Sequence, residues 1–266
     1  MKHRPSPVAL ALAGIVAIFL LAPLISVVPI SLTPARFLTM PKGELSLIHY
    51  RELIDNPDWA SSILLSLRIG IASSAIATFL ALAFALGVWM FNPRFSALLV
   101  GFVLLPMVVP PVVSAMTLYF FLTSLSQVSG AIGYDTWFGV TLAHVVMITP
   151  FAVVLILVAL AQIDRRIDLA ARGLGATVLQ RVFKVILPNI RFGVLTAALL
   201  TFVLSWDEIG VTLFVTSVNT ITLPRLMWMG VHDNIDPAIA AISVVLIVIT
   251  TITLVGRMLL QREEPA

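Results

Sequence analysis

Residues 168–188 read DLAARGLGATVLQRVFKVILP and form a polar-containing segment in an otherwise apolar chain of 266 residues. Apolar side chains recur there and just upstream at three- and four-residue spacing, which predicts one apolar helical face: Ile163, Ile167, Ala170 and Leu174. Gly175 favours the end of that helix, because glycine accepts the left-handed backbone of a helix C-cap. The segment therefore predicts a short amphipathic helix whose small residues let a partner surface approach closely.

The composition identifies an integral membrane protein. Apolar residues make up 60% of the chain and charged residues 11%, and the mean hydropathy is +1.08. A soluble domain has about 45–50% apolar and about 25% charged residues. The chain has 0 cysteines, which excludes disulfides and thiolate metal sites. Its net charge of +3 is too small to indicate a nucleic-acid partner.

Long apolar stretches predict an all-α, polytopic protein with six transmembrane helices in a single domain, residues 1–266. A helical span needs about 20 apolar residues. The first apolar run is longer than a signal-peptide core of about 7–15 residues and has no small-residue cleavage site, so it is expected to stay uncleaved. The expected spans are about 8–30, 62–90, 95–122, 137–160, 190–214 and 237–260, with a segment at about 163–189 between the fourth and fifth.

The basic residues predict the orientation of these spans. With the N-terminus inside, inner segments hold eleven lysines and arginines and outer segments hold four, as the positive-inside rule requires. Arg68, at the start of a span, is assigned to neither side. The inner set is Lys2, Arg4, Arg94, Arg165, Arg166, Arg172, Arg181, Lys184, Arg191, Arg257 and Arg262, and the outer set is Arg36, Lys42, Arg51 and Arg225. Both termini and the 163–189 segment are therefore expected in the cytoplasm.

The 168–188 segment resembles the cytoplasmic coupling motif in the permease subunits of ABC importers. That motif begins with Glu-Ala-Ala, continues to a glycine, and ends in a run like Ile-Leu-Pro. The matching residues are Ala170, Ala171, Gly175, Ile186, Leu187 and Pro188. Leu169 stands where the family has glutamate, and the nearest carboxylate is Asp168. This departure puts one polar docking contact of the family in doubt. The residues alone also allow an amphipathic loop helix between two spans.

The resemblance implies a type I importer permease fold in a bacterial inner membrane. It also implies the partners: ATPase subunits, expected to be two and to hold ATP and Mg²⁺, a second permease, an extracytoplasmic substrate-binding protein and membrane lipid. This chain is expected to bind no cofactor and to be no enzyme. It lacks the Gly-x-x-x-x-Gly-Lys-Ser/Thr phosphate cradle. It also has no metal-ligand spacing and no serine nucleophile beside a base in the sequence.

Trp206, Asp207 and Glu208 are candidates for the substrate pathway. Asp207 lies sixteen residues after Arg191, about 24 Å along a helix, which is the outer half of a hydrocarbon core about 30 Å thick. Carboxylates there should line a watery cavity or pair with a cation. The alternative is that the fifth helix ends early and both carboxylates lie at the solvated outer rim. His144, in the middle of the fourth span, either lines the pathway or is bonded to another helix.

The chain from about residue 45 to residue 254 is similar to the spermidine/putrescine branch of these permeases. The similar stretches are 50–53 (YREL), 143–146 (AHVV), 150–151 (PF), 205–208 (SWDE), 211–214 (VTLF), 222–224 (TLP) and Trp228. Leu65 departs from the asparagine common there. The resemblance implies a small cationic cargo, a polyamine, and the outer carboxylates agree with it: Glu44, Glu52, Asp55, Asp58, Asp135, Asp233 and Asp236.

Other cargoes and other classes of transporter remain alternatives. Related permeases carry aminophosphonates, opines or amino-acid derivatives. A secondary transporter or channel would be expected to have inverted repeats and ion-coupling residues near the midplane. The sequence has no pair of matching halves.

Overall fold

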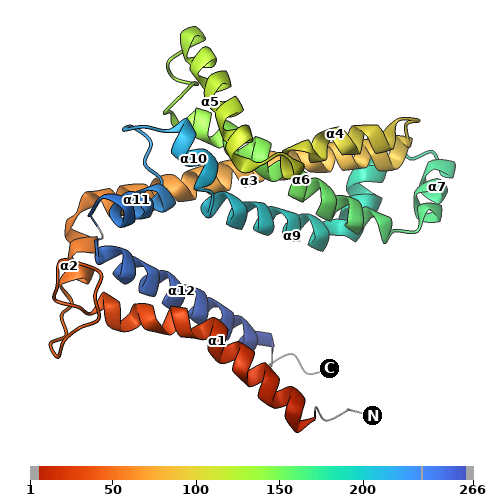
Figure 1. Ribbon diagram of the computed structural model, residues 1–266. Helices are drawn as coiled ribbons and strands as arrows, with labels where there is room; N and C mark the ends of the chain where they lie inside the picture. The colour runs from red at the N-terminus through yellow and green to blue at the C-terminus, as the bar shows by residue number, and fades with distance from the viewer. Residues whose placement is uncertain (1–5, 235, 262–266) are drawn as a thin grey trace. The chain divides into compact units, whose positions relative to one another are not determined.

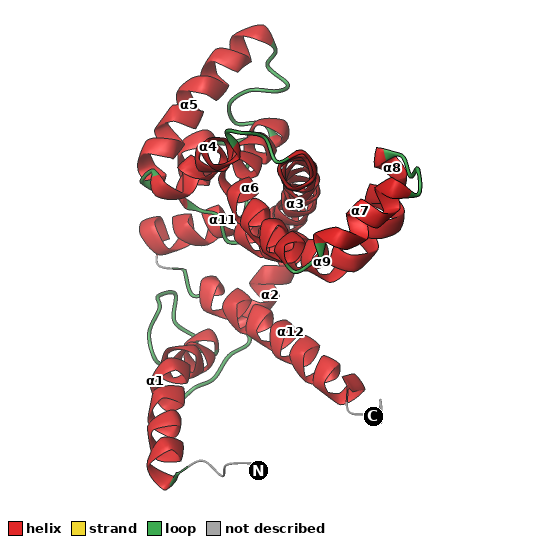
Figure 2. Cartoon of the chain, turned by 90° about the vertical axis from the view of Figure 1, so that its right-hand side faces the viewer, coloured by secondary structure: helices red, strands yellow, loops and turns green. Residues whose placement is uncertain are grey.

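The computed structural model describes residues 6–234 and 236–261, and among these it contains helices and loops but no strand (Figures 1 and 2). The chain divides into two compact units. Unit 1 consists of Met1–Ser61 with Leu226–Ala266, and unit 2 is Ser62–Arg225. Lys2, Arg4 and Arg262, which the orientation argument used, lie outside the described residues.

Unit 1 is built around two long apolar helices, α1 (Pro7–Ser31) and α12 (Ala238–Gln261), which pack against each other. Ser6 caps α1 by accepting a hydrogen bond from the backbone N–H of Ala9 at 3.2 Å. A short helix, α2 (Ile48–Asp55), packs against α12. A π-helical turn, η2 (Gly230–Asn234), precedes α12.

The α2 helix is tied to the end of α1. It begins at Ile48, whose N–H donates to the Ser46 hydroxyl at 3.2 Å. It ends before Asn56-Pro57, since a proline disfavours helical backbone in the residue before it. The hydroxyls of Ser31 and Tyr50 share a hydrogen bond of 2.8 Å, which joins α1 to α2.

Unit 2 holds most of the remaining helices. In chain order they are α3 (Pro57–Phe91, of which the first residues belong to unit 1), α4 (Ser96–Val108), α5 (Pro111–Val128), α6 (Trp137–Ala161), α7 (Arg165–Gly173), α8 (Val178–Arg181), the π-helix η1 (Val182–Ile186), α9 (Leu187–Trp206), α10 (Gly210–Val215) and α11 (Leu223–Met229), which continues into unit 1. One buried cluster joins α3, α6 and α9, and another joins α3, α5, α6 and α10.

The α6 and α9 helices approach each other closely because Gly193 has no side chain. A Cβ built on Gly193 would lie 2.4 Å from the Cβ of Ala159, closer than real carbon atoms come. Small residues are the usual means by which membrane helices pack tightly, because lipid supplies no hydrophobic driving force between them. Ile156, Leu160 and Ala197, all fully buried, surround this contact.

Two of the expected spans differ from the observed helices. The stretch at 95–122 is divided into α4 and α5 at Val109-Pro110, because Pro110 and Pro111 both lack the N–H that would continue the helix. The stretch at 190–214 is also divided, since α9 ends at Trp206 and α10 is a separate helix. The α1, α3 and α6 helices occupy the stretches expected at 8–30, 62–90 and 137–160.

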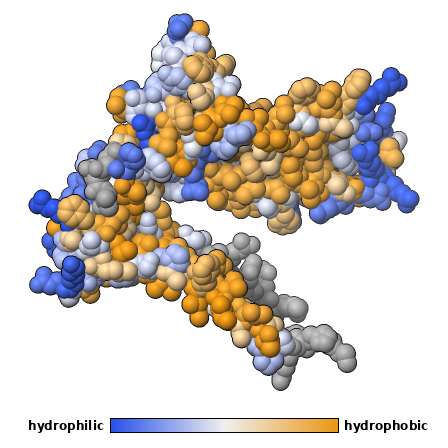
Figure 3. Space-filling view, in the orientation of Figure 1, coloured by the Kyte–Doolittle hydropathy of each residue, from blue (hydrophilic) through white to orange (hydrophobic). Residues whose placement is uncertain are grey.

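Five helices among the described residues are long and apolar enough to cross a membrane. They are Pro7–Ser31, Pro57–Phe91, Pro111–Val128, Trp137–Ala161 and the joined segment Val178–Trp206. The apolar stretch Ala238–Thr253 within α12 is shorter, so the count of six spans stays a prediction. Figure 3 shows hydrophobic residues over α4 and α9 of unit 2 and hydrophilic residues where α7 lies. This distribution suits helices in lipid and a polar segment in water.

The contact at Gly193 predicts that Gly193→Ala destabilises the protein by about 1–3 kcal/mol, the usual cost of forcing an extra carbon into a packed interface. Thermal unfolding of the purified chain in nanodiscs measures it. The control is Gly87→Ala in α3, where an added Cβ meets nothing within 4 Å. Equal melting temperatures for the two variants would contradict the close α6–α9 contact.

Candidate functional site

The α7 helix has well-defined ends. Asp164 begins it by accepting the Arg166 N–H at 2.9 Å. At the other end Gly175 has a φ of 80°, in the left-handed region that glycine tolerates best. The N–H groups of Gly175 and Ala176 donate to the carbonyls of Arg172 and Ala171 at 3.0 and 3.1 Å, the paired pattern of a Schellman motif. The predicted helix end at Gly175 is confirmed.

The chain from α8 to α9 is one continuous helical segment. Thr177 and Gln180 form a reciprocal capping box that starts α8. Helical backbone then continues through η1 into α9 without a loop. Of the motif residues, Ile186 is buried at the end of η1, and Leu187 and Pro188 form the first turn of α9. Proline suits a first turn, where its missing N–H is not needed.

A buried ion pair holds α7 against α8. The Nε and Nη2 atoms of Arg181 donate to the two carboxylate oxygens of Asp168 at 2.8 and 2.5 Å, and each residue is only 8% exposed. Such bidentate charge-assisted pairs are the stronger hydrogen bonds in proteins. The sequence placed Asp168 among the docking residues but missed its partner, because the two lie thirteen residues apart in the chain. Asp168 braces the segment from within.

The coupling segment, residues 163–189, exposes several large apolar side chains. Leu169 is 60% exposed and Leu174 is 89% exposed, and Ala170 and Gly175 are exposed beside them. Leu179 and Phe183 on α8 and η1 are also exposed. Of the predicted apolar face, Ile167, Ala170 and Leu174 are exposed, whereas Ile163 packs against the buried cluster of unit 2. Grouped apolar side chains on a polar segment mark a surface for a partner.

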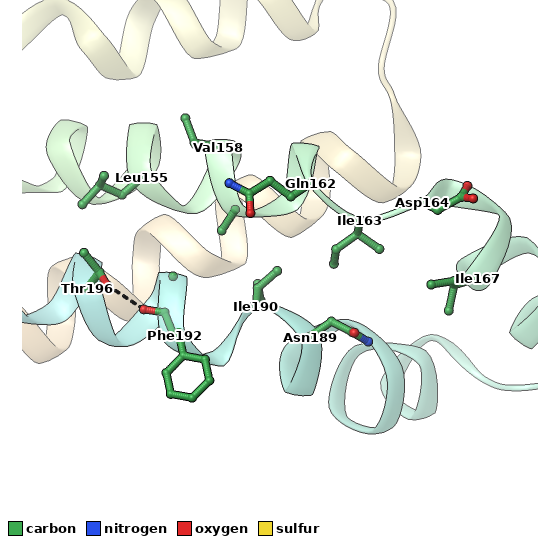
Figure 4. A pocket seen from close by; sticks show the side chains of 12 residues that line it. Leu155, Val158, Gln162, Ile163, Asp164, Ile167, Asn189, Ile190, Phe192 and Thr196 are labelled. Atoms are coloured by element: carbon green, nitrogen blue, oxygen red, sulfur yellow. Dashed lines mark hydrogen bonds between the residues drawn. The ribbon is translucent and has the colours of Figure 1, made fainter. Parts of the chain in front are cut away.

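A pocket of about 660 Å³ lies where the coupling segment joins the long helices (Figure 4). It is lined by Leu155 of α6, by Gln162, which follows α6, and by Ile190 and Phe192 of α9. Ile167 of α7 closes one end. Beside this pocket the segment is held by apolar packing, because Ile163, Val182 and Ile186 belong to or contact the buried cluster of α3, α6 and α9.

The acidic pair lies at the break between α9 and α10. Asp207 follows the last residue of α9 and is exposed, and no described residue donates a hydrogen bond to its carboxylate. The Oε1 atom of Glu208 accepts the Val211 N–H at 2.8 Å and so caps α10. The structure therefore has the early helix end that the sequence left as an alternative. The ring of Trp206 stacks on that of Phe202, with centroids 6.2 Å apart.

His144 is bonded on both sides of this break. Its Nδ1 lies 2.8 Å from the Ser205 hydroxyl at the end of α9, and its Nε2 lies 3.0 Å from the Thr212 hydroxyl in α10. Ser205 in turn shares a hydrogen bond of 2.8 Å with Ser73 of α3. Because His144 is only 1% exposed, it is a satisfied histidine joining helices, the second of the two interpretations of the sequence. The serine and threonine partners of His144 form no sequence pattern from which this hydrogen-bond network could be predicted.

Asp135 anchors the loop that follows α10. It has a φ of 54° and is 7% exposed, so it does not belong with the solvated outer carboxylates counted from the sequence. Its two oxygens accept the backbone N–H groups of the residues from Ser217 to Thr220 at 2.8–3.1 Å. Burial acts to raise the pKa of Asp135, but these four amide donors together lower it below its ordinary value. The side-chain amide of Asn219 adds a fifth donor.

The chain matches the family model described as "Binding-protein-dependent transport system inner membrane component" over residues 77–264. It is 30% identical over 230 residues to the putrescine transport system permease protein PotI of Escherichia coli, covering 86% of this chain and 82% of that one. It is 28% identical over 250 residues to the spermidine/putrescine transport system permease protein PotC of Haemophilus influenzae, covering 94% and 95%.

The fold is similar to a chain in the crystal structure of a bacterial ABC transporter involved in the import of the acidic polysaccharide alginate. The TM-score is 0.69 at 15% identity, and the similarity covers 97% of this chain and 95% of that chain. At this level of identity the likeness concerns the fold alone.

The turn at Gly175 predicts a specific response to adding one methyl group. Gly175→Ala should cost about 1–2 kcal/mol, since a Cβ is strained in left-handed backbone. Hydrogen exchange should then become faster at residues 171–177, because the Schellman turn opens more often. Gly173→Ala is the matched control, because Gly173 is helical and has open space around it. The turn is not restrained as described if both variants exchange alike.

The bonds of Asp135 predict that Asp135→Asn loosens residues 217–220. Whichever oxygen becomes an NH₂ group, at least two backbone donors lose their acceptor. A lost hydrogen bond to a charged group costs about 1.5–3 kcal/mol, so amide exchange there should accelerate. Asn219→Ala removes one donor only and should have a smaller effect. Unchanged exchange in Asp135→Asn would contradict this anchoring role.

The same anchor depends on pH in a defined direction. Because the folded pKa of Asp135 lies below the ordinary value of 3.8, its stabilisation is complete above that value and is lost as pH falls through the folded pKa. Exchange at residues 217–220 should therefore accelerate on acidification below about pH 4 in the parent, and Asp135→Asn should lack that acceleration.

Proposed function

The chain belongs to the family of binding-protein-dependent transport system inner membrane components, and from this premise we propose how its helices work in an ATP-driven importer. It is a multi-pass permease of the inner membrane, and its helices form the path of the cargo. The exposed apolar surface of the coupling segment docks on an ATPase subunit, which holds ATP and Mg²⁺. Two ATPase subunits, a second permease and a substrate-binding protein complete the assembly.

The docking surface uses Leu169, Ala170 and Ala171 of α7 with Leu174 and Gly175 at its end. Support for this comes from the exposure of Leu169 and Leu174, because contact between apolar side chains and water is unfavourable and a partner surface would remove it. An exposed leucine at position 169 fits an apolar hollow in the partner where a glutamate would need a polar one. Asp168 contributes indirectly, because its ion pair with Arg181 fixes the angle at which α7 is presented.

Movement at the docking surface passes to the membrane helices through α9. The brace at Arg181 belongs to the continuous helical segment that ends at Trp206. Ile186, Leu187 and Pro188 lie at its junction with α9, where Ile186 is buried. The helix α9, about 30 Å long at 1.5 Å per residue, links the ATPase contact to the break before α10. This helical segment is the element that moves between two states, and ATP binding shifts the equilibrium between those states.

The break between α9 and α10 is the proposed contact with the cargo. The observation that carries this is the exposed carboxylate of Asp207, which no described residue pairs or bonds. Trp206 offers an aromatic face beside it, and ammonium groups bind both aromatic faces and carboxylates. Glu208 and His144 hold the break in shape through Val211, Ser205 and Thr212. His144 thus acts as a positioning residue of the pathway.

We propose a polyamine as the cargo, on the support of this carboxylate and of the putrescine and spermidine/putrescine relatives. An aminophosphonate, opine or amino-acid derivative is the alternative within the same class of importer. The positive-inside distribution supports cytoplasmic termini and a cytoplasmic coupling segment. In that orientation the break faces the outer half of the membrane, where cargo released by a binding protein enters.

The proposal predicts that Asp207→Asn lowers polyamine uptake at least about tenfold, since an interaction with a charged group is worth about 1.5–3 kcal/mol. The measurement is ATP-dependent uptake of labelled putrescine into proteoliposomes that contain the whole importer, with saturating loaded binding protein. Affinity of the binding protein itself should not change, because that step occurs on another chain.

Two controls separate charge from structure. Asp55→Asn removes an exposed carboxylate on α2 and should leave uptake unchanged. Glu208→Gln keeps an oxygen that can accept the Val211 N–H, so α10 remains capped while a charge is lost. Full uptake by Asp207→Asn would remove Asp207 from the pathway. Strong uptake of an anionic cargo by the parent would overturn the polyamine assignment, and uptake without ATP would overturn the importer mechanism.

A further inference from the structure

Unit 1 contains a group of three potential metal ligands far from the proposed pathway residues in the sequence. His49 and Glu52 lie one turn apart on α2, and Asp236 lies just before α12. One ligand atom from each residue lies within 4.8 Å of the other two. The sequence predicted no metal site, because Asp236 is separated from the α2 pair by most of the chain. The fold of unit 1 brings the three together.

The hydrogen bonding of His49 leaves one ring nitrogen free for a ligand. Its Nε2 lies 3.1 Å from the backbone carbonyl of Ala35, and a carbonyl can only accept, so Nε2 carries a proton. Nδ1 is buried, the residue is 5% exposed, and Nδ1 has no hydrogen-bond partner. A buried polar atom left unpaired destabilises the folded state, so a ligand on Nδ1 would relieve that cost. Metal-binding histidines commonly donate their second N–H to a backbone carbonyl in this way.

The two carboxylates converge on this unpaired nitrogen. The Oε2 atom of Glu52 lies 3.6 Å from Nδ1 of His49, and Glu52 is exposed, so solvent reaches the group. One oxygen of Asp236 accepts the Ala238 N–H at 2.8 Å, which leaves the other available. Among the side chains that the structure describes, no lysine or arginine is ion-paired with either carboxylate. Two carboxylates and a nitrogen lone pair are therefore gathered without a balancing cation among the described side chains.

We propose that His49, Glu52 and Asp236 bind a divalent transition-metal ion of the Zn²⁺ class. Imidazole nitrogen and carboxylate oxygen are ordinary Zn²⁺ ligands at about 2.0–2.2 Å, which places tetrahedral ligand atoms about 3.4 Å apart. The His49–Glu52 separation of 3.6 Å is already close to that spacing. A rotation of the exposed Glu52 side chain completes the approach, and the fourth position stays open to water. The ion would join α2 to the start of α12.

The test is Zn²⁺ binding by the full-length permease in nanodiscs after chelator treatment, measured by competition with a chromophoric chelator. One saturable Zn²⁺ per chain is expected, together with a higher melting temperature, because a ligand that binds only the folded state stabilises it. Glu52→Gln and Asp236→Asn should each weaken binding at least about tenfold, as loss of a ligand exceeds the 10–100-fold effect of second-shell changes. Asparagine at 236 keeps an oxygen for the Ala238 N–H, so the start of α12 is preserved.

The matched control is Asp55→Asn, on the same helix but outside the group, which should bind Zn²⁺ like the parent. Bound Co²⁺ should show the visible absorption of a site with nitrogen ligation, and Glu52→Gln should alter it. Absence of saturable binding, or equal weakening by all three carboxylate variants, would overturn the proposal. So would a melting temperature of the parent protein that Zn²⁺ does not raise.

Discussion

In a lipid environment, a helix can be interrupted only where other protein groups take over its missing backbone hydrogen bonds. The break between α9 and α10 meets this condition through Glu208, which accepts the Val211 N–H, and through Thr212, whose hydroxyl donates to the Glu208 carbonyl. His144 then joins the two helix ends through Ser205 and Thr212. These bonds satisfy the break without Asp207, which is exposed and has no partner among the described residues. The proposed cargo contact depends on these local hydrogen bonds.

At the opposite end of α9, the ion pair between Asp168 and Arg181 has a comparable role. Burying two charges is costly unless they are paired and well bonded, and the bidentate geometry meets that need. Fixed in this way, α7 presents exposed leucines instead of folding them inward. One helical segment therefore links a surface suited to a partner with a break suited to a cation. The tight α6–α9 contact at Gly193 keeps that segment against the rest of unit 2.

The helix break, the Asp135 anchor and the group around His49 differ in how their buried polar atoms are bonded. In unit 2 the buried polar groups of the break and of the Asp135 anchor find partners within the chain. In unit 1, Nδ1 of His49 does not, and two carboxylates lie beside it. An unpaired buried nitrogen next to negative charge is a stable arrangement when an ion or a proton is shared among them. This contrast is the reason for assigning a metal to unit 1.

The sequence by itself determined the class of the protein, its long apolar helices and the polar segment that ends at Gly175, because hydropathy, helical periodicity and glycine backbone preference are local properties. It also identified Asp207 and Glu208 as unusual, since carboxylates are rare within apolar stretches. Only the tertiary structure decided what depends on distant contacts. The Asp168–Arg181 brace, the bonds of His144, the burial of Asp135 and the convergence of His49, Glu52 and Asp236 each join residues remote in sequence. The break between α9 and α10 is also decided there, because His144 of α6 joins the two helix ends.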